Sequence, residues 1–205
     1  MLKTRARKIK LLLFDVDGVM TDGKLWIFPA PGGAQQSTAS HAEQLAGHGG
    51  YALASTSMIE AKGFHAHDGT AISLARMGGV KTGLITKRIS ETVALRARDL
   101  KLEYVYQGVM VKARVFEEIL EKEGIAAGAV AYIGDDVIDL PVMRRCGFAI
   151  AVANARSEVK KEAHWVTPHG GGDGAIRDAV EYILRAQGSW NGVLKRYLER
   201  GDPSK

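Results

Sequence analysis

The chain contains a single cysteine, Cys146, among its 205 residues. One cysteine excludes an intrachain disulfide and any metal site built from several thiolates, and so little cysteine is typical of proteins in a reducing compartment. The sequence also lacks an HExxH pattern and Cys/His spacing of the zinc-binding kind, so its six histidines predict no zinc site.

Long apolar stretches are missing as well. The basic first ten residues lead into the run LLLF at 11–14, but Asp15 and Asp17 interrupt it well before a signal peptide or a membrane span would be complete. We therefore expect a cytoplasmic protein that does not bind membranes.

An excess of positive charge is confined to one end of the chain. The formal net charge is +5, from 28 basic and 23 acidic residues. Five of the basic residues lie within the first ten positions, and the rest of the chain has 23 of each sign. This distribution indicates a basic tail rather than a basic groove, so we expect no nucleic-acid binding. The alternative, binding through the basic start, would be sensitive to salt.

The order of apolar runs predicts the fold. Short apolar runs alternate with helical patterns, which is typical of an α/β protein: a Rossmann-like parallel sheet with helices on both faces. Predicted strands cover residues 9–14, 80–85, 103–106, 129–133, 148–152 and 165–167. Amphipathic helices are predicted at 112–123, where Gly124 follows as a stop, and at 174–186.

The chain length fits one domain with an insertion. We predict a single domain over residues 1–188 and a C-terminal tail over 189–205. Residues 29–60 break the alternating rhythm, because they are rich in Gly, Ala, Ser, Gln and Pro and contain only two acidic or basic residues, Glu43 and Glu60. We expect a β-hairpin insertion, or flap, with arms at 24–28 and 51–58.

Polar groups follow several predicted strands, at the sheet edge where ligands bind in such folds. In chain order these groups are Asp15 with Asp17, Thr86, Lys112 at a helix start, and Asp135 with Asp136 and Asp139. Any one such aspartate is more often a turn former or a helix cap. The ordered set is different, because it contains every group that phosphoryl transfer needs.

The chemistry explains why these residue types belong together. Several carboxylates in one cleft repel each other unless a divalent cation neutralises them, and Mg²⁺ prefers hard oxygen ligands. Asp15 and Asp135 are the candidate side-chain ligands, together with a backbone carbonyl. Lys112 and the hydroxyl of Thr86 would hold the oxygens of the transferred phosphoryl group.

These motifs resemble the haloacid dehalogenase superfamily of aspartate-nucleophile phosphatases. The matching residues are DVDG at 15–18, LIT at 84–86, Lys112, and GDD at 134–136 with Asp139. More narrowly, the chain is similar to the 3-deoxy-D-manno-octulosonate 8-phosphate phosphatases. That similarity lies in DVDGVMTDG at 15–23, DG at 68–69, YQG at 106–108, YIGDDVIDLPV at 132–142 and GGDGAIR at 171–177.

The resemblance implies a core without a large cap, dependence on Mg²⁺, and a homotetramer whose neighbouring subunits help to close each site. Asp15 would attack phosphorus and form an aspartyl-phosphate, while Asp17 would protonate the leaving sugar oxygen and later activate water. The implied metal residues are Asp15, Asp17 and Asp135. The implied contacts with a small phosphorylated sugar acid are Arg88, His67, Asp68, Asp136 and Asp139.

Three short stretches depart from the family pattern. The chain has TKR at 86–88 where the family usually has Thr-Gly-Arg, HDG at 67–69 where it has Arg-Asp-Gly, and MV at 110–111 where it has Ser-Asp. These changes concern the substrate more than the chemistry, so an acylneuraminate 9-phosphate or another sugar phosphate stays open. A catalytically silent phosphate-binding or regulatory domain is the alternative outside enzymes.

Overall fold

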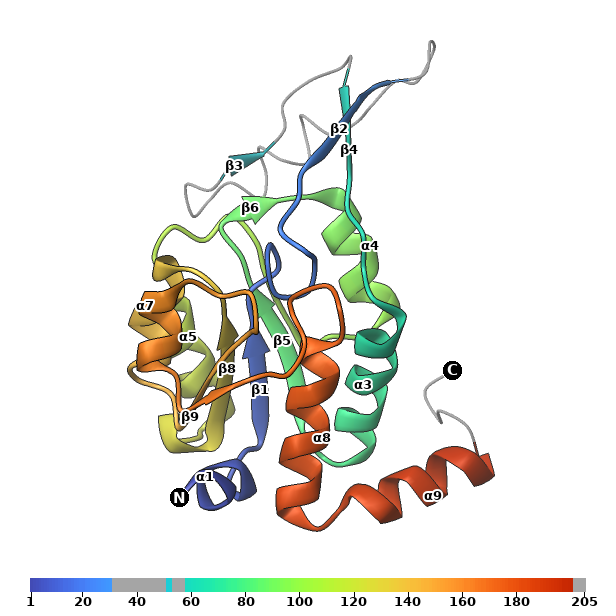
Figure 1. The fold of residues 1–205 in the computed structure, drawn as a ribbon, viewed down its shortest axis with the longest axis vertical. Helices are drawn as coiled ribbons and strands as arrows, with labels where there is room; N and C mark the ends of the chain where they lie inside the picture. Colours follow the sequence, from blue (N-terminus) through green and yellow to red (C-terminus); the bar gives the residue numbers. More distant parts are fainter. Residues whose placement is uncertain (31–50, 53–57, 201–205) are drawn as a thin grey trace.

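The computed structural model describes residues 1–30, 51–52 and 58–200. Six strands form one parallel sheet in the order β10-β9-β8-β1-β5-β7, with helices packed on both of its faces (Figure 1). The strands are β1 (Leu11–Phe14), β5 (Lys81–Ile85), β7 (Tyr104–Tyr106), β8 (Val130–Gly134), β9 (Phe148–Ala151) and β10 (Trp165–Val166). The predicted α/β fold class is confirmed.

The helices alternate with these strands along the chain. They are α1 (Leu2–Arg7), α3 (Ala66–Met77), α4 (Glu91–Asp99), α5 (Lys112–Glu123), α6 (Leu140–Met143), α7 (Ser157–Glu162), α8 (Ala175–Gln187) and α9 (Trp190–Arg200), with short 3-10 turns η2 (Ala127–Ala129) and η3 (Val137–Asp139). Helix α5 has the predicted bounds, and Gly124 ends it in the left-handed conformation with φ 63°. No helix in the described part of the chain combines the length and the apolarity that crossing a membrane requires.

The core lies around the two central strands. All residues of β1 and β8 are buried, because helices cover both faces of the sheet. The register pairs Phe14 with Ile133, and the backbone N–H of Asp15 donates to the carbonyl of Ile133 at 3.1 Å. The residues that follow β1 and β8, Asp15 and Asp135, therefore leave the sheet side by side.

A two-stranded hairpin projects from the carboxyl end of the sheet (Figure 1). Strand β2 (Trp26–Pro29) pairs antiparallel with β4 (Met58–Ala61). The first arm agrees with the prediction and Met58 lies in the second arm, but residues 51–52, at the start of the predicted second arm, do not pair with the first. Strand β3 (Tyr51–Ala52) instead pairs in parallel with β6 (Arg88–Ile89). The choice of partner depends on neighbours in the fold, which a local apolar pattern does not contain. Residues 31–50 and 53–57 of the predicted insertion lie outside the described residues.

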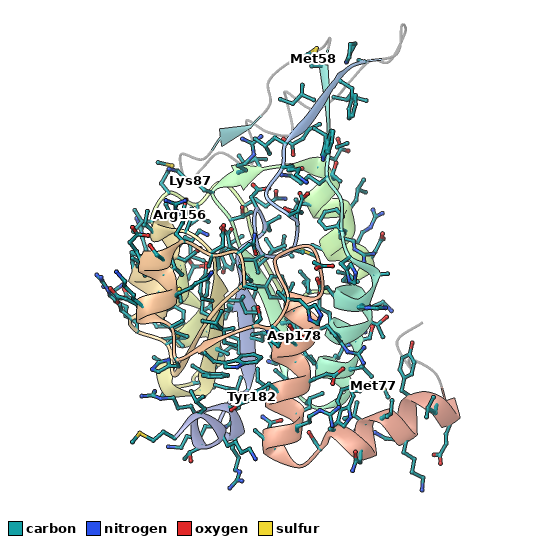
Figure 2. The ribbon with its side chains drawn as sticks, in the orientation of Figure 1. Met58, Met77, Lys87, Arg156, Asp178 and Tyr182 are labelled. Atoms are coloured by element: carbon teal, nitrogen blue, oxygen red, sulfur yellow. The ribbon has the colours of Figure 1, made fainter. Side chains whose placement is uncertain are left out.

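The predicted tail begins with a helix that packs on the domain. In α9, Trp190 is buried, and the guanidinium carbons of Arg177 and Arg185 lie 5.4 and 4.7 Å from its ring centroid. Nη2 of Arg196 donates to the carbonyl of Met77 at 2.8 Å. Met77, the last residue of α3, is labelled in Figure 2 and lies beside α9. Helix α9 thus closes the side of the molecule opposite the hairpin.

Candidate active site

Asp15 meets Lys112 in a buried ion pair at the carboxyl end of β1. Its Oδ2 lies 2.9 Å from Nζ of Lys112, and its Oδ1 accepts a hydrogen bond from the backbone N–H of Val16 at 2.7 Å. Lys112 is the first residue of α5, so the start of that helix places the ammonium beside the end of β1. The structure thereby brings together two of the predicted catalytic residues.

Thr86 follows β5, the strand next to β1. Its backbone N–H donates to the carbonyl of Tyr106 at 2.9 Å, and its own carbonyl accepts from the N–H of Val109 at 3.0 Å. The residue is buried. These backbone bonds fix Thr86 at the same sheet edge as Asp15.

Asp139 lies beneath this pair. Its Oδ1 accepts hydrogen bonds from Nζ of Lys112 at 2.7 Å and from the hydroxyl of Tyr132 at 2.8 Å. Its Oδ2 accepts from the backbone N–H groups of Asp135 and Asp136 at 3.1 and 3.3 Å. Asp139 was predicted as a substrate contact, but its carboxylate is fully buried and holds Lys112 and the turn at Asp135 in place. Tyr132 was not predicted, because a tyrosine in an apolar strand is indistinguishable from a core residue.

Three carboxylates gather around Lys112. One oxygen from each of Asp15, Asp135 and Asp139 lies within 4.8 Å of the others. Oδ1 of Asp135 is buried and has no hydrogen-bond partner in the described part of the chain. Three carboxylates against one ammonium leave a formal charge of −2. The unpartnered oxygen of Asp135, the excess negative charge and a donor set made only of oxygen atoms fit one hard divalent cation such as Mg²⁺.

The crowding of charge changes the acidity of these groups. Burial raises the pKa of Asp15 to about 6, although Lys112 lowers it, and burial together with Asp139 and Asp15 raises the pKa of Asp135 to about 8. Burial lowers the pKa of Lys112, but Asp15 and Asp139 outweigh it, so this pKa lies above its ordinary value. These shifts favour the charged form of Lys112, and Asp135 would give up a proton on binding a divalent cation.

Glycines let two loops approach this site. Gly18 has φ +91°, and a Cβ there would overlap the carboxyl group of Asp135. A Cβ on Gly171 would overlap the carbonyl oxygen of Gly18, and the N–H of Gly172 donates to the carbonyl of Val19 at 3.0 Å. The glycine-rich stretch GGDG at 171–174 thus packs on the loop that holds Asp15.

Asp17 and Arg88 meet two residues that return from the hairpin. Nζ of Lys62 contacts Oδ1 of Asp17 and lies 3.2 Å from Oε1 of Glu60. Nη2 of Arg88 lies 2.7 Å from Oε2 of Glu60, and its Nε lies 3.7 Å from Oδ2 of Asp17. Burial raises the pKa of Glu60, but Arg88 and Lys62 more than offset this and hold it below its ordinary value. The side chain of Asp17, predicted as a metal residue, lies outside the acidic triad.

Neither Glu60 nor Lys62 was predicted as a site residue. Lys62 lies 45 residues beyond Asp17 in the chain, and no motif surrounds it. The signal that could have found the pair is the charge pattern itself, since Glu60 is one of two charged residues in the long polar and apolar insertion.

The other predicted substrate residues lie around the site. Asp68 is buried, and its Oδ1 accepts from the backbone N–H of Arg177 at 2.8 Å, which joins the starts of α3 and α8. His67 is exposed, and its ring lies edge-on to that of His65 with 4.8 Å between centroids. Asp136 is exposed and accepts from the N–H of Val137 at 2.7 Å. Contacts of these residues with substrate stay predictions.

Comparison with known proteins identifies the family to which this chain belongs. The family model described as haloacid dehalogenase-like hydrolase matches residues 85–177. The 3-deoxy-D-manno-octulosonate 8-phosphate phosphatase of Salmonella typhi is 35% identical over 185 residues, which cover 90% of this chain and 84% of that protein.

Solved structures of similar proteins point to the same family. The 3-deoxy-D-manno-octulosonate 8-phosphate phosphatase of Yersinia pestis is 34% identical with a TM-score of 0.76, covering 93% of this chain and 89% of that one. The enzyme of the same name from Moraxella catarrhalis, crystallised with a magnesium ion, a phosphate ion and KDO, is 29% identical with a TM-score of 0.78, covering 96% and 97%. The chain therefore belongs to the haloacid dehalogenase-like hydrolases, and it is a phosphoric monoester hydrolase.

Proposed function

We propose that this chain is a Mg²⁺-dependent phosphatase that hydrolyses a small sugar acid phosphate of the 3-deoxy-D-manno-octulosonate 8-phosphate type through an aspartyl-phosphate on Asp15. One observation carries the proposal. The buried Asp15 carboxylate is fixed by Lys112 at 2.9 Å, beside an Asp135 oxygen without a hydrogen-bond partner among the described residues. The proposed nucleophile, a cation for the phosphoryl oxygens and a carboxylate oxygen that could hold a metal ion thus meet at one sheet edge.

The first step forms one bond and breaks another. An oxygen of Asp15 attacks phosphorus, the bond from phosphorus to the sugar oxygen breaks, and Asp17 gives its proton to that oxygen. Lys112 holds the negative charge that builds up on the phosphoryl oxygens. A divalent cation held by Asp15 and Asp135 would let the anionic phosphate approach the carboxylates.

The second step frees the enzyme. Water gives a proton to Asp17 and attacks phosphorus, and the bond from phosphorus to Asp15 breaks with release of phosphate. Lys112 stays in place because Asp139 and Tyr132 hold it from below, 2.7 and 3.4 Å from its Nζ. The same groups therefore serve both halves of the reaction.

The names of two relatives support the proposed substrate class. The proteins of Salmonella typhi and Yersinia pestis are named for 3-deoxy-D-manno-octulosonate 8-phosphate, and the similarity covers 90% and 93% of this chain. Arg88 is our candidate contact for the substrate carboxylate. The changed neighbours at Lys87 and His67 leave an acylneuraminate 9-phosphate as the second candidate.

A substrate panel tests the proposal. Phosphate release from sugar acid phosphates is measured with and without Mg²⁺, for the native chain, for Asp15→Asn and for Asp99→Asn, whose side chain is 62% exposed. We expect Mg²⁺-dependent turnover that Asp15→Asn lowers by at least about a thousandfold, because an amide cannot replace the nucleophile. Asp99→Asn should match the native chain.

The opposite outcome is equally informative. If folded, Mg²⁺-loaded native protein hydrolyses no member of the panel, the chain is better described as a silent phosphate-binding domain. Binding of inorganic phosphate, measured by calorimetry, would then separate that alternative from a chain without any anion site.

We also propose that the enzyme works as a homotetramer, as the family resemblance implies. In support, four consecutive apolar residues before and in β2 are 45–51% exposed: Leu25, Trp26, Ile27 and Phe28. An exposed apolar stretch of this kind is typical of a protein interface. Sedimentation velocity of the native chain should give the mass of four subunits, and a single subunit at micromolar concentration would contradict the proposal.

A further inference from the structure

The hairpin brings a buried lysine to the proposed acid–base residue. Strand β4 runs from Met58, labelled at its outer end in Figure 2, back toward the sheet, and Lys62 follows its last residue. The side chain of Lys62 is only 1% exposed, although the residue lies on a projecting element. Burying an ammonium group removes its hydration, which is costly in free energy, so such a group is buried only where carboxylates compensate for the lost water.

Two carboxylates compensate for Lys62. Its Nζ contacts Oδ1 of Asp17 and lies 3.2 Å from Oε1 of Glu60, whose side chain is 8% exposed. The other oxygen of Glu60 binds Arg88, which approaches the second oxygen of Asp17 to 3.7 Å. Asp17 is therefore in contact with Lys62 at one oxygen and has Arg88 near the other, while 22% of its side chain stays open to solvent.

The strand register sets this arrangement. Ile27 pairs with Glu60 and Trp26 with Ala61, and β2 leads directly out of the loop that contains Asp15 and Asp17. Successive side chains of a strand point to opposite faces, so a slip by one residue would turn Glu60 away from Arg88. The hairpin is thus fixed at one end to the catalytic loop and at the other to the carboxylate of Asp17.

We infer that Lys62 is a positioning residue for Asp17: its ammonium, itself held by Glu60, keeps the Asp17 carboxyl group where it exchanges a proton with the leaving-group oxygen. This inference rests on the proposed function and deepens it. It makes the hairpin part of the catalytic machinery, although no hairpin residue reacts with the substrate.

The leaving group provides a readout that a purely structural role would not move. A sugar alkoxide needs a proton as it leaves, whereas p-nitrophenolate does not, so only the sugar phosphate depends on a correctly placed Asp17. Leaving-group release is measured in a single turnover with enzyme in excess and Mg²⁺ present, so that hydrolysis of the aspartyl-phosphate does not contribute.

We expect Lys62→Met to slow release from the sugar phosphate by roughly tenfold to a hundredfold, a share of what general acid catalysis supplies. Release of p-nitrophenolate should change by less than about threefold. Glu60→Gln should show the same selectivity more weakly, and Lys62→Arg, which keeps the positive charge, should recover part of the loss. Adding Lys62→Met to Asp17→Asn should slow release no further, because coupled residues are not additive.

The controls separate this role from folding and from substrate binding. Lys81→Met removes an exposed lysine that pairs with Glu123 at 2.8 Å and should leave both rates unchanged. Circular dichroism melting curves identify any variant that does not fold, and Glu60→Gln and Lys62→Arg then provide the comparison.

Two results would overturn the inference alone in an active native chain. One is an equal loss in the rate of leaving-group release from both substrates. The other is an unchanged maximal rate of release, with a change only in the enzyme concentration needed to reach it. A native chain inactive toward both phosphates would instead overturn the proposed function, and this inference with it.

Discussion

At the scale of single residues, the site is built on a buried hydrogen-bonded charge cluster. Asp139 is fully buried, yet each of its oxygens has two donors, from Lys112 and Tyr132 on one side and from two backbone N–H groups on the other. Such a cluster is stable only when every member keeps its partners. Its function is to fix Lys112, and through Lys112 the orientation of Asp15.

We predict that Asp139→Asn lowers the free energy of unfolding by about 3 kcal/mol, because one member of a buried ion pair is lost. The amide offers one oxygen instead of two, and its NH₂ group would face other donors. Urea unfolding followed by circular dichroism measures the change. Asp99→Asn, at an exposed aspartate, is the matched control and should lie within about 0.5 kcal/mol of the native chain. A variant as stable as this control would contradict the role given to Asp139.

At the scale of elements, two contacts between segments far apart in the chain support the loop that follows β1 and contains Asp15, Asp17 and Gly18. Asp68 at the start of α3 caps α8 through the N–H of Arg177, and the glycine-rich stretch that leads into α8 packs on Gly18 and Val19. The loop with Asp15 therefore rests against the start of α8. Close backbone contact of this kind leaves no room for a side chain.

We predict that Gly171→Ala destabilises the protein by about 1–3 kcal/mol and lowers its phosphatase activity, because the new methyl group would push the two loops apart. Gly128→Ala is the matched control. A Cβ at Gly128 meets no described atom within 4 Å. Unfolding curves and steady-state rates of the two variants make the comparison. Equal behaviour of both would show that the contact at Gly18 relaxes without cost.

At the scale of the whole molecule, the sheet order concentrates negative charge at one edge. Strands β1 and β8 are central neighbours, so Asp15 and Asp135 end at the same place, and α6 and η3 bring Asp139 beneath them. Their mutual repulsion in a buried site opposes folding whenever all three are ionised. The stability of the entire domain should therefore depend on pH and on divalent cations.

The direction in which stability changes with pH follows from Asp135, whose pKa is raised from its ordinary value of 3.8 to about 8. Between these values the folded state binds a proton that the unfolded state has released, so the stabilising contribution is complete below pH 3.8 and is lost as pH rises to about 8. We predict that the melting temperature of EDTA-treated protein falls from pH 5 to pH 8. Added Mg²⁺ should raise it most at the upper end, where no proton has to be displaced.

Scanning calorimetry at several pH values, with EDTA or with Mg²⁺, tests this dependence. The Asp135→Asn variant has no carboxyl group to titrate at this position, so the difference between native and variant isolates its contribution. If that difference does not change between pH 5 and pH 8 in EDTA, Asp135 has an ordinary pKa and the triad is not a charge-strained metal site.

Much of the fold and of the catalytic set follows from local sequence. Apolar runs that end in Asp15, Thr86 and Asp135 define the strands, and the amphipathic period from Lys112 to Gly124 defines α5, because strand ends and helix ends are set by neighbouring residues. Parallel strands joined by helices then bring their carboxyl ends to one edge. The sequence by itself therefore determined the fold class and the residues that we propose to surround the phosphate.

Only the tertiary structure decided which of the remaining residues contact one another. The pairing of Lys62 with Asp17, the inward orientation of Asp139, the packing of Gly171 on Gly18 and the partner of strand β3 all join residues far apart in the chain or buried by other elements. Such contacts depend on strand register and on burial, which arise only when the whole chain has packed. A local pattern contains neither, and for that reason the contact between the hairpin and Asp17 became visible only in the fold.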